Sequence, residues 1–168
     1  VRTHYPSAAE QEIAIVEQEY SRFPDAAERV TVPQYMKEVV ADITRLARKS
    51  PEVNQRSGVS LRVSISNYET LLSVAFKRSL LHREPASPRV SDLASLLAST
   101  VGKIELESVK EGREAKVVQD LTKKAVLNVF GRYFSPEEFD SVVSKFEEGL
   151  VVESGNAVRS SAYVDQLG

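Results

Sequence analysis

The sequence predicts an all-α protein. Apolar residues recur at steps of three and four through most of the 168 residues, which is the spacing of one helix face. Capping residues, prolines and glycines stand at the ends of these stretches. The one segment that alternates like a strand has no evident partner. The chain is long enough to bury a core without disulfides or a structural metal.

Two helices are predicted in the first 50 residues. The first covers residues 8–23, after a Ser-Ala-Ala-Glu capping box at 7–10, and Pro24 ends it. The second begins at residues 31–34, where a proline is tolerated in the first turn, and ends before Pro51. Its apolar face makes it the clearest helix of the chain.

The longest helix is predicted at residues 61–84, and the other elements are expected to cover its apolar face. That face is formed by Leu61, Ile65, Tyr68, Leu72, Ala75 and Phe76. A Ser-Gly turn at 57–58 precedes it. A second capping box at residues 66–69 leaves open a later start, which would place Arg62 in a loop.

The following segments are shorter or ambiguous. A short helix is predicted from Ser91, its cap, to Leu97. Residues 99–112 form either a linker or a helix start, since a lone strand at 103–107 could not satisfy its own backbone.

Two more helices and a tail complete the prediction. A helix ending at Tyr133 carries two apolar strips, which indicates contacts on two sides. A helix beginning with the capping box at residues 135–138 ends at Gly149 and is expected to bury one face. That face consists of Phe139, Val142, Val143 and Phe146. The polar residues after Val152 indicate a loose tail.

Composition excludes several classes of protein. The net charge of -2 argues against binding to nucleic acid, and the absence of cysteine excludes disulfides and thiolate metal sites. No apolar run is long enough to span a membrane and no signal peptide is visible, so a cytoplasmic location is expected. The only methionine is Met36, which suggests a piece of a longer protein.

The sequence contains no catalytic motif. The patterns GxxxxGK[ST], GxGxxG, HExxH and GxSxG are all missing. His4 and His82 have no ligand partner at helical spacing, which favours packing or surface roles over metal binding. A basic cluster has two interpretations, a solvated helix end, which is favoured, or a site for an acidic partner or phosphate. It comprises Lys77, Arg78, His82, Arg83 and Arg89.

Arg62 is the candidate binding residue. It lies in the first turn of the longest predicted helix, where a cation opposes the helix dipole. Its rigid five-donor guanidinium could hold an anion such as a nucleotide phosphate. Alternatively, the side chain lies along the helix with its head in solvent.

Six short stretches carry a resemblance to a known family. They are RTHYP at 2–6, VP at 32–33 with EVV at 38–40, SGVSLRVSISNYE at 57–69, PRVSDL at 88–93 and GKIELE at 102–107. In this order they resemble the C-terminal helical region of bacterial AAA+ ATPases, in the group of the magnesium chelatase ATPase subunit and MoxR-like proteins. The resemblance covers essentially the whole chain and is most specific over residues 31–107.

The resemblance implies an AAA+ lid-type helical bundle followed by a helical extension. Residues 1–107 would form the lid, or sensor-2, domain, and residues 108–168 a C-terminal extension with a loose tail. Leu61-Arg62 is similar to the sensor-2 pair of the family, so Arg62 would contact the terminal phosphate of ATP. Arg56 is a nearby rival for this role. The implied function is a nucleotide-responsive lid that couples ATP binding and hydrolysis to remodelling of a partner protein. The alternative is a free-standing helical module for protein–protein interaction.

The resemblance also implies cofactors and partners. ATP and Mg²⁺ would bind the full-length protein, whereas this region alone lacks the Walker motifs and is expected to bind nucleotide weakly and hydrolyse none. The partners would be an upstream α/β ATPase subdomain, neighbouring subunits of a ring and an unknown protein substrate. No nucleic acid or membrane span is expected. No residue supports insertion of magnesium into a porphyrin.

Overall fold

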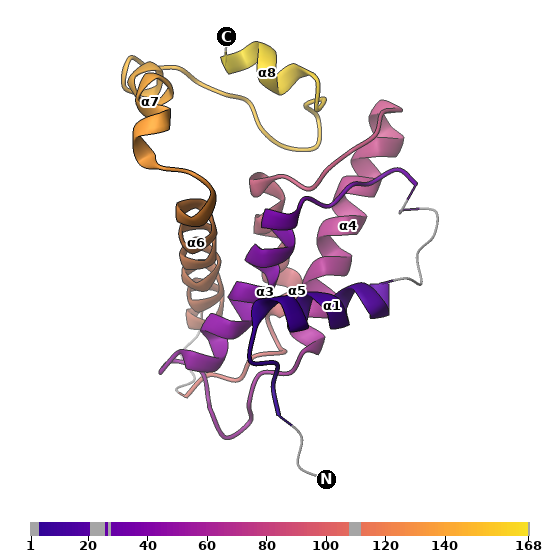
Figure 1. The fold of residues 1–168 in the computed structure, drawn as a ribbon, viewed down its shortest axis with the longest axis vertical. Helices are drawn as coiled ribbons and strands as arrows, with labels where there is room; N and C mark the ends of the chain where they lie inside the picture. Colours follow the sequence, from indigo (N-terminus) through magenta and orange to yellow (C-terminus); the bar gives the residue numbers. More distant parts are fainter. Residues whose placement is uncertain (1–3, 21–25, 27, 108–111, 168) are drawn as a thin grey trace.

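The computed structural model describes residues 4–20, 26, 28–107 and 112–167 (Figure 1). In these ranges every regular element is a helix and no strand forms, so the predicted all-α class is confirmed. The α-helices are α1 (Ala9–Tyr20), α3 (Gln34–Lys49), α4 (Arg62–His82), α5 (Leu96–Thr100), α6 (Arg113–Tyr133), α7 (Asp140–Glu147) and α8 (Ala162–Leu167). Two short 3₁₀ helices are η1 (Val90–Ser95) and η2 (Pro136–Phe139).

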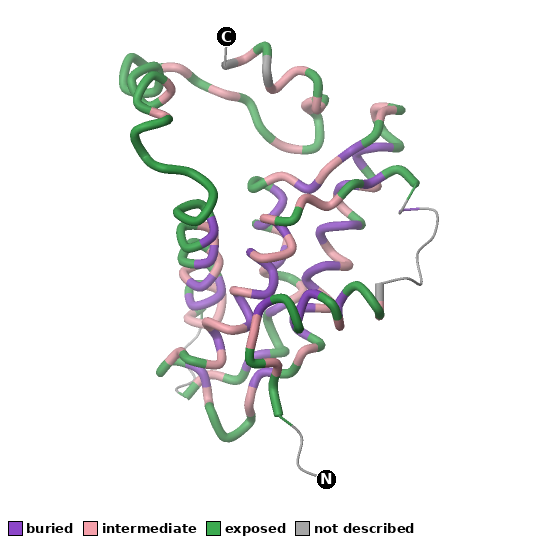
Figure 2. The backbone as a smooth tube through the Cα atoms, viewed as in Figure 1, coloured by how far each residue is buried: buried purple, intermediate pink, exposed green. Residues whose placement is uncertain are grey.

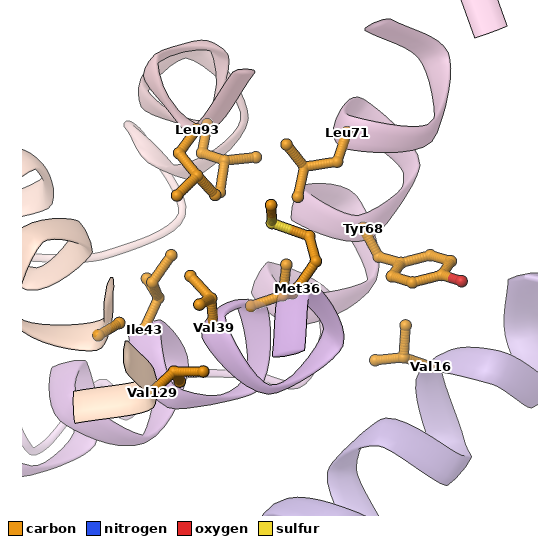
Figure 3. Close-up of a cluster of buried hydrophobic side chains, with 11 residues drawn as sticks. Val16, Met36, Val39, Ile43, Tyr68, Leu71, Leu93 and Val129 are labelled. Atoms are coloured by element: carbon orange, nitrogen blue, oxygen red, sulfur yellow. The ribbon is translucent and has the colours of Figure 1, made fainter. Parts of the chain in front are cut away.

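Helix α3 lies at the centre of the bundle and contacts α1, α4 and α6. Met36 and Ile43 on α3 are fully buried, and Leu71 of α4 and Leu96 of α5 pack in the same cluster (Figure 3). Burying an aliphatic side chain of this size stabilises the fold by about 1.5–3 kcal/mol. The apolar face that periodicity predicted for residues 34–49 is therefore the one that holds the bundle together.

Helix α6 belongs to the same cores as the helices before it. Ala125 and Val129 lie in the cluster around α3, and Val117 and Leu121 pack in a second cluster with Val59 of the loop before α4. The two predicted parts of the chain, residues 1–107 and 108–168, thus share two hydrophobic cores.

A short backbone pairing corrects one prediction. Residues 103–107 were expected to lack a partner, but the Asn54 N–H donates to the Glu105 carbonyl at 2.8 Å and the Glu107 N–H to the Glu52 carbonyl at 3.0 Å. Val53 and Leu106 form an antiparallel bridge between these bonds. This pairing could not be predicted from the sequence, because the segment around Val53 is polar and has no alternating pattern.

The caps differ in detail from those predicted. Ser7 bonds Gln11 instead of Glu10, through both its N–H and its hydroxyl. The cap of the short helix is Arg89, not Ser91, because the Arg89 N–H donates to the Asp92 carboxylate at 2.8 Å. Residues 21–23, predicted to end the first helix, lie outside the described residues.

Polar contacts also join α3 to the C-terminal half of α6. The Tyr133 hydroxyl donates to Glu38 Oε1 at 2.7 Å, and Asn128 donates to Asp42 at 2.9 Å. The hydrogen bond to Glu38 raises the pKa of Tyr133 above its ordinary value. These contacts attach α6 to α3 beyond their shared core.

The segment after α6 leaves the bundle. The rings of Phe130, Phe134 and Phe139 cluster with centroids 5.2–5.4 Å apart, and the predicted capping box forms between Ser135 and Glu138. The prediction that α7 buries an apolar face is wrong, since none of its residues is buried and Phe146 is 48% exposed. Figure 2 shows this helix coloured as exposed along most of its length. In the structure α7 lies beyond the end of α6, where the bundle does not reach it.

Candidate functional site

The candidate site is the N-terminal end of α4. Arg62 is the first residue of this helix, and the Ser60 hydroxyl accepts a hydrogen bond from its N–H at 3.2 Å. The helical bonds begin at once, since the Ile65 N–H donates to the Leu61 carbonyl at 3.1 Å. The predicted start at residues 61–62 is therefore confirmed, and the alternative start near Ser66 is wrong.

Both candidate arginines are exposed. The Arg62 guanidinium makes no hydrogen bond or ion pair with any residue that the structure describes. Arg56 lies in the loop before α4, and only its backbone N–H is engaged, with Asn54 Oδ1 at 2.9 Å. Each guanidinium thus keeps its donors available to a ligand, and the two arginines are not brought together by any contact.

A buried polar network holds this end of α4 against α1 and α3. Glu12 of α1 is fully buried and accepts from Arg48 Nη1 at 2.7 Å and from the Ser64 hydroxyl at 2.5 Å. Ser64 also bonds Thr44 of α3 at 2.6 Å. Arg48 Nε donates to the Val59 carbonyl at 3.0 Å, three residues before Arg62. The network therefore fixes the turn from which Arg62 projects.

Sequence analysis did not identify this network, although one signal was present. Glu12 shares the face of α1 with the buried residues Ala9, Ile13 and Val16, at helical spacing. A carboxylate on an apolar face is buried only when it is paired. Arg48, its partner, is 36 residues further along the chain.

The turn before α4 requires a glycine. Gly58 has a φ of 69°, and an added Cβ would collide with the Tyr5 hydroxyl. The Tyr5 ring in turn lies 4.4 Å from the Arg48 guanidinium. The turn, the ring and the buried network are thus packed together.

We expect Gly58→Ala to lower the free energy of unfolding by about 1–3 kcal/mol, because alanine disfavours the left-handed backbone and would clash with Tyr5. Urea unfolding measures the loss. Gly102→Ala is the matched control, since Gly102 has a φ of 79° and open space around its Cβ position. Adding Tyr5→Phe should recover part of the loss. Equal losses in Gly58→Ala and Gly102→Ala would show that the clash with Tyr5 does not contribute to the loss of stability.

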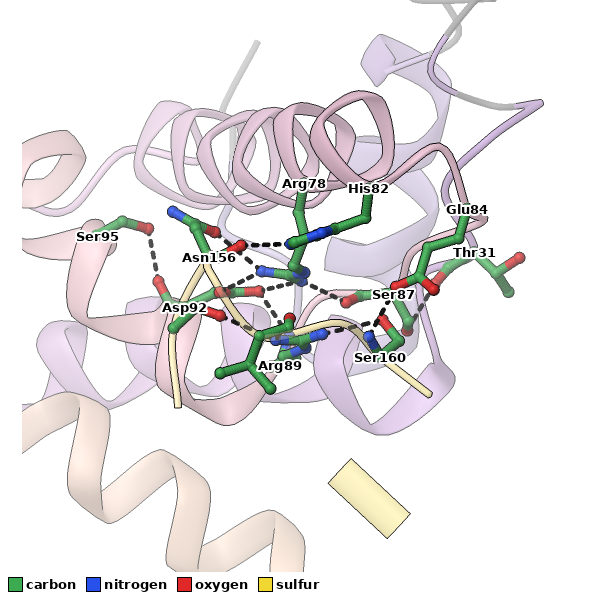
Figure 4. A network of polar contacts seen from close by, with 12 residues as sticks. Thr31, Arg78, His82, Glu84, Ser87, Arg89, Asp92, Ser95, Asn156 and Ser160 are labelled. Atoms are coloured by element: carbon green, nitrogen blue, oxygen red, sulfur yellow. Dashed lines mark hydrogen bonds and ion pairs between the residues drawn. The ribbon is translucent and has the colours of Figure 1, made fainter. Parts of the chain in front are cut away.

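At the other end of α4, two arginines of the basic cluster, Arg78 and Arg89, are bonded to groups of the same chain (Figure 4). Arg78 is fully buried and binds both carboxylate oxygens of Asp92, at 2.9 and 2.8 Å. Its Nη2 also donates to the Ser87 carbonyl at 2.7 Å. The favoured prediction of a solvated helix end is therefore wrong for Arg78, and its paired guanidinium is not available to a phosphate. Lys77 and Arg83 of the same cluster are exposed.

The same cluster holds the C-terminal tail. Arg89 donates to the carbonyls of Gly155 and Val158 at 3.1 and 2.9 Å, and its guanidinium lies 4.4 Å from the Tyr163 ring. The His82 ring donates to the Asn156 carbonyl at 2.8 Å. The tail was predicted to be loose, but residues 155–163 are bound across α4 and η1 because backbone carbonyls there satisfy the arginine.

Two hollows lie near these features. One, of about 590 Å³, is lined by Ser57, Gly58, Ser60 and Lys103, among others, and lies beside the turn before α4. The other, of about 540 Å³, is the η1–α6 groove, an apolar channel between η1, α5 and α6. Its walls include Val90, Leu93, Leu97, Val118, Val126 and Leu127. Of the second apolar strip predicted for α6, which consists of Val126, Leu127 and Phe130, the first two line this groove. Leu127 is 69% exposed.

The described residues hold no group of three or more His, Asp or Glu side chains that could bind a metal ion. No helix in the described part of the chain has both the length and the apolarity needed to cross a bilayer. No protein-family model, curated protein or solved structure is significantly similar to this chain.

Proposed function

We propose that this chain is the helical lid and C-terminal extension of an AAA+ ATPase, and that Arg62 senses the terminal phosphate of ATP. The observation that supports this role is the exposed Arg62 guanidinium, which projects from the first turn of α4 without a partner among the described residues. An unpaired arginine fork at a fixed position suits bidentate binding of phosphate.

The buried network explains how binding at Arg62 would move the whole lid. Ser64, Glu12 and Arg48 connect the first turn of α4 to α1 and α3, so a force on Arg62 acts on the bundle as one body. Arg62 would hold the terminal phosphate before hydrolysis and lose its partner afterwards. The bundle could then rotate and act on a partner protein.

The residues of this chain supply only part of a nucleotide site. Arg62 offers a cation, but the sequence has no glycine-rich phosphate loop and the described residues include no carboxylate cluster for Mg²⁺. The groups that hold ATP and Mg²⁺ would come from an α/β subdomain, of the same or a neighbouring subunit. ATP supplies the charged phosphate there, and this chain supplies the positioned arginine.

Replacing Arg62 with alanine tests the proposal in the protein that includes the nucleotide-binding part. We expect ATP turnover to fall about 100-fold, the usual effect of removing one preorganised donor to a developing charge. Arg62→Lys should recover little, because lysine keeps the charge but not the fork. Steady-state phosphate release measures both.

Arg56→Ala is the matched control, since Arg56 is also exposed and lies six residues away. It should retain nearly full turnover. Loss of activity in Arg56→Ala alone would transfer the sensor role to Arg56, and unchanged activity in Arg62→Ala would refute the assignment. A coding sequence upstream of Val1 that lacks GxxxxGK[ST] would remove the ATPase proposal altogether.

A second candidate function is a helical protein–protein interaction module. The η1–α6 groove favours it, because an apolar channel between helices is a common receptor for an amphipathic helix. This function requires no nucleotide, so it would be retained by Arg62→Ala. The two candidates are therefore separated by the same variant.

A further inference from the structure

Two apolar surfaces are exposed in the described part of the chain. The first is the η1–α6 groove, where Val90 is 57% and Leu127 69% exposed. The second is the apolar face of α7, where Val143 is 50% and Phe146 48% exposed. A channel and a helix of matching apolar character thus occur in one chain, and the residues that the structure describes leave both exposed.

Contacts at both ends hold α7 away from the groove of its own copy. Before α7, the rings of Phe130, Phe134 and Phe139 are clustered at the end of α6. After α7, Arg89 binds the carbonyls of Gly155 and Val158. To enter its own groove, α7 would have to break one of these attachments. Figure 1 shows α7 beyond the C-terminal end of α6.

The charges of the two surfaces are complementary. The segment 136–148 carries one lysine and five carboxylates, from Glu137, Glu138, Asp140, Glu147 and Glu148. Lys123 lines the groove, and Lys116 and Lys124 are exposed on the same helix. That helix also carries Glu114 and Asp120, which are half-buried, but no acidic side chain lines the groove. Opposite charges of this kind favour encounter and fix orientation.

We propose that the η1–α6 groove binds α7 of a second copy of this chain. Phe146 and Val143 enter the channel beside Leu127, and the carboxylates of the 136–148 segment lie near the lysines of α6. Because each copy has one groove and one α7, two copies can exchange helices and close a dimer with two identical contacts. The proposal does not depend on the nucleotide role of Arg62.

Sedimentation velocity on the whole chain over a range of concentrations tests the proposal. We expect a monomer–dimer equilibrium in which Leu127→Asp or Phe146→Asp weakens dimerisation at least about 30-fold, the effect of losing a central apolar anchor. Both side chains are exposed, so folding should be retained, and circular dichroism checks this. Leu81→Asp is the control, since Leu81 is 62% exposed on α4 outside both surfaces and should leave dimerisation unchanged.

Mixing the two variants gives the sharpest test. A dimer of Leu127→Asp with Phe146→Asp retains one intact contact, whereas each variant with itself retains none. Native mass spectrometry should therefore detect mixed dimers in preference to dimers of either variant alone. Lys123→Glu and added salt should each weaken the dimer of the original chain.

Three results would overturn the proposal. A chain that stays monomeric at all concentrations has no such contact, and the groove then serves a different partner. A dimer that neither Leu127→Asp nor Phe146→Asp weakens uses another surface. A monomer in which Phe146→Asp removes hydrogen-exchange protection from α6 has its own α7 in the groove.

Discussion

Asp92→Ala is expected to lower the free energy of unfolding by about 3–5 kcal/mol, because it leaves the Arg78 guanidinium buried without a counter-ion. Arg78 is fully buried and its two Nη atoms bind the two oxygens of Asp92. Asp92 also caps η1 through the Arg89 N–H, which adds to the loss. Chemical denaturation followed by circular dichroism measures the change.

Two further variants separate the ion pair from other effects. Arg78→Met with Asp92→Leu removes both charges and should recover much of the stability, particularly since Arg78 Nε has no hydrogen-bond partner among the described residues. Glu17→Ala breaks the more exposed pair with Lys37 and should cost only about 0–1 kcal/mol. A loss of less than about 1 kcal/mol in Asp92→Ala would mean that solvent reaches Arg78.

Glu12→Ala is expected to cost a similar amount, about 3–5 kcal/mol, because Arg48 would lose its carboxylate partner in a nearly buried position. The effect should also reach the candidate site. Arg48 holds the Val59 carbonyl, so an unpaired Arg48 would loosen the turn before α4. Hydrogen exchange at residues 59–65 should increase more than exchange at the distant end of α4.

Glu12→Gln is the conservative control for this site. Glutamine keeps an acceptor for Ser64 or Arg48 but not the charge, so we expect a smaller loss of about 1–3 kcal/mol. If Glu12→Ala destabilises the chain without raising exchange near Arg62, the network stabilises the bundle but does not position the arginine. That result would contradict the proposal that the network transmits movement from Arg62 to the bundle, and the Arg62→Ala experiment would still decide the sensor role.

The position of the candidate site could be predicted from the sequence, but the buried network that holds it could not. The Ser-Gly turn and the apolar period that starts at Leu61 placed Arg62 at the first turn, and the structure confirms this position. Glu12 and Arg48, which hold that turn, are separated by 36 residues. Helical spacing put Glu12 on the buried face, yet only the approach of α3 to α1 shows which cation reaches it.

The apolar residues of α6 and α7 show a different limit of sequence reasoning. Periodicity predicted contacts on two sides of the helix ending at Tyr133 and a buried face on the helix after Ser135. It could not tell that Leu127 and Phe146 stay exposed. An apolar stripe shows that burying this face is favourable, but it does not show whether the same chain or another molecule packs against it.

The sequence by itself determined the all-α class, the second helix and the position of Arg62 at the head of α4. These features depend on local spacing, caps and turns, which act within a few residues of one another. Only the tertiary structure decided that Arg78 is paired with Asp92, that the tail is bound to Arg89, and that the η1–α6 groove is open. Those outcomes depend on which distant segments meet in the fold. A charge is buried only where a partner pairs with it, and an apolar face is buried only where another surface packs against it.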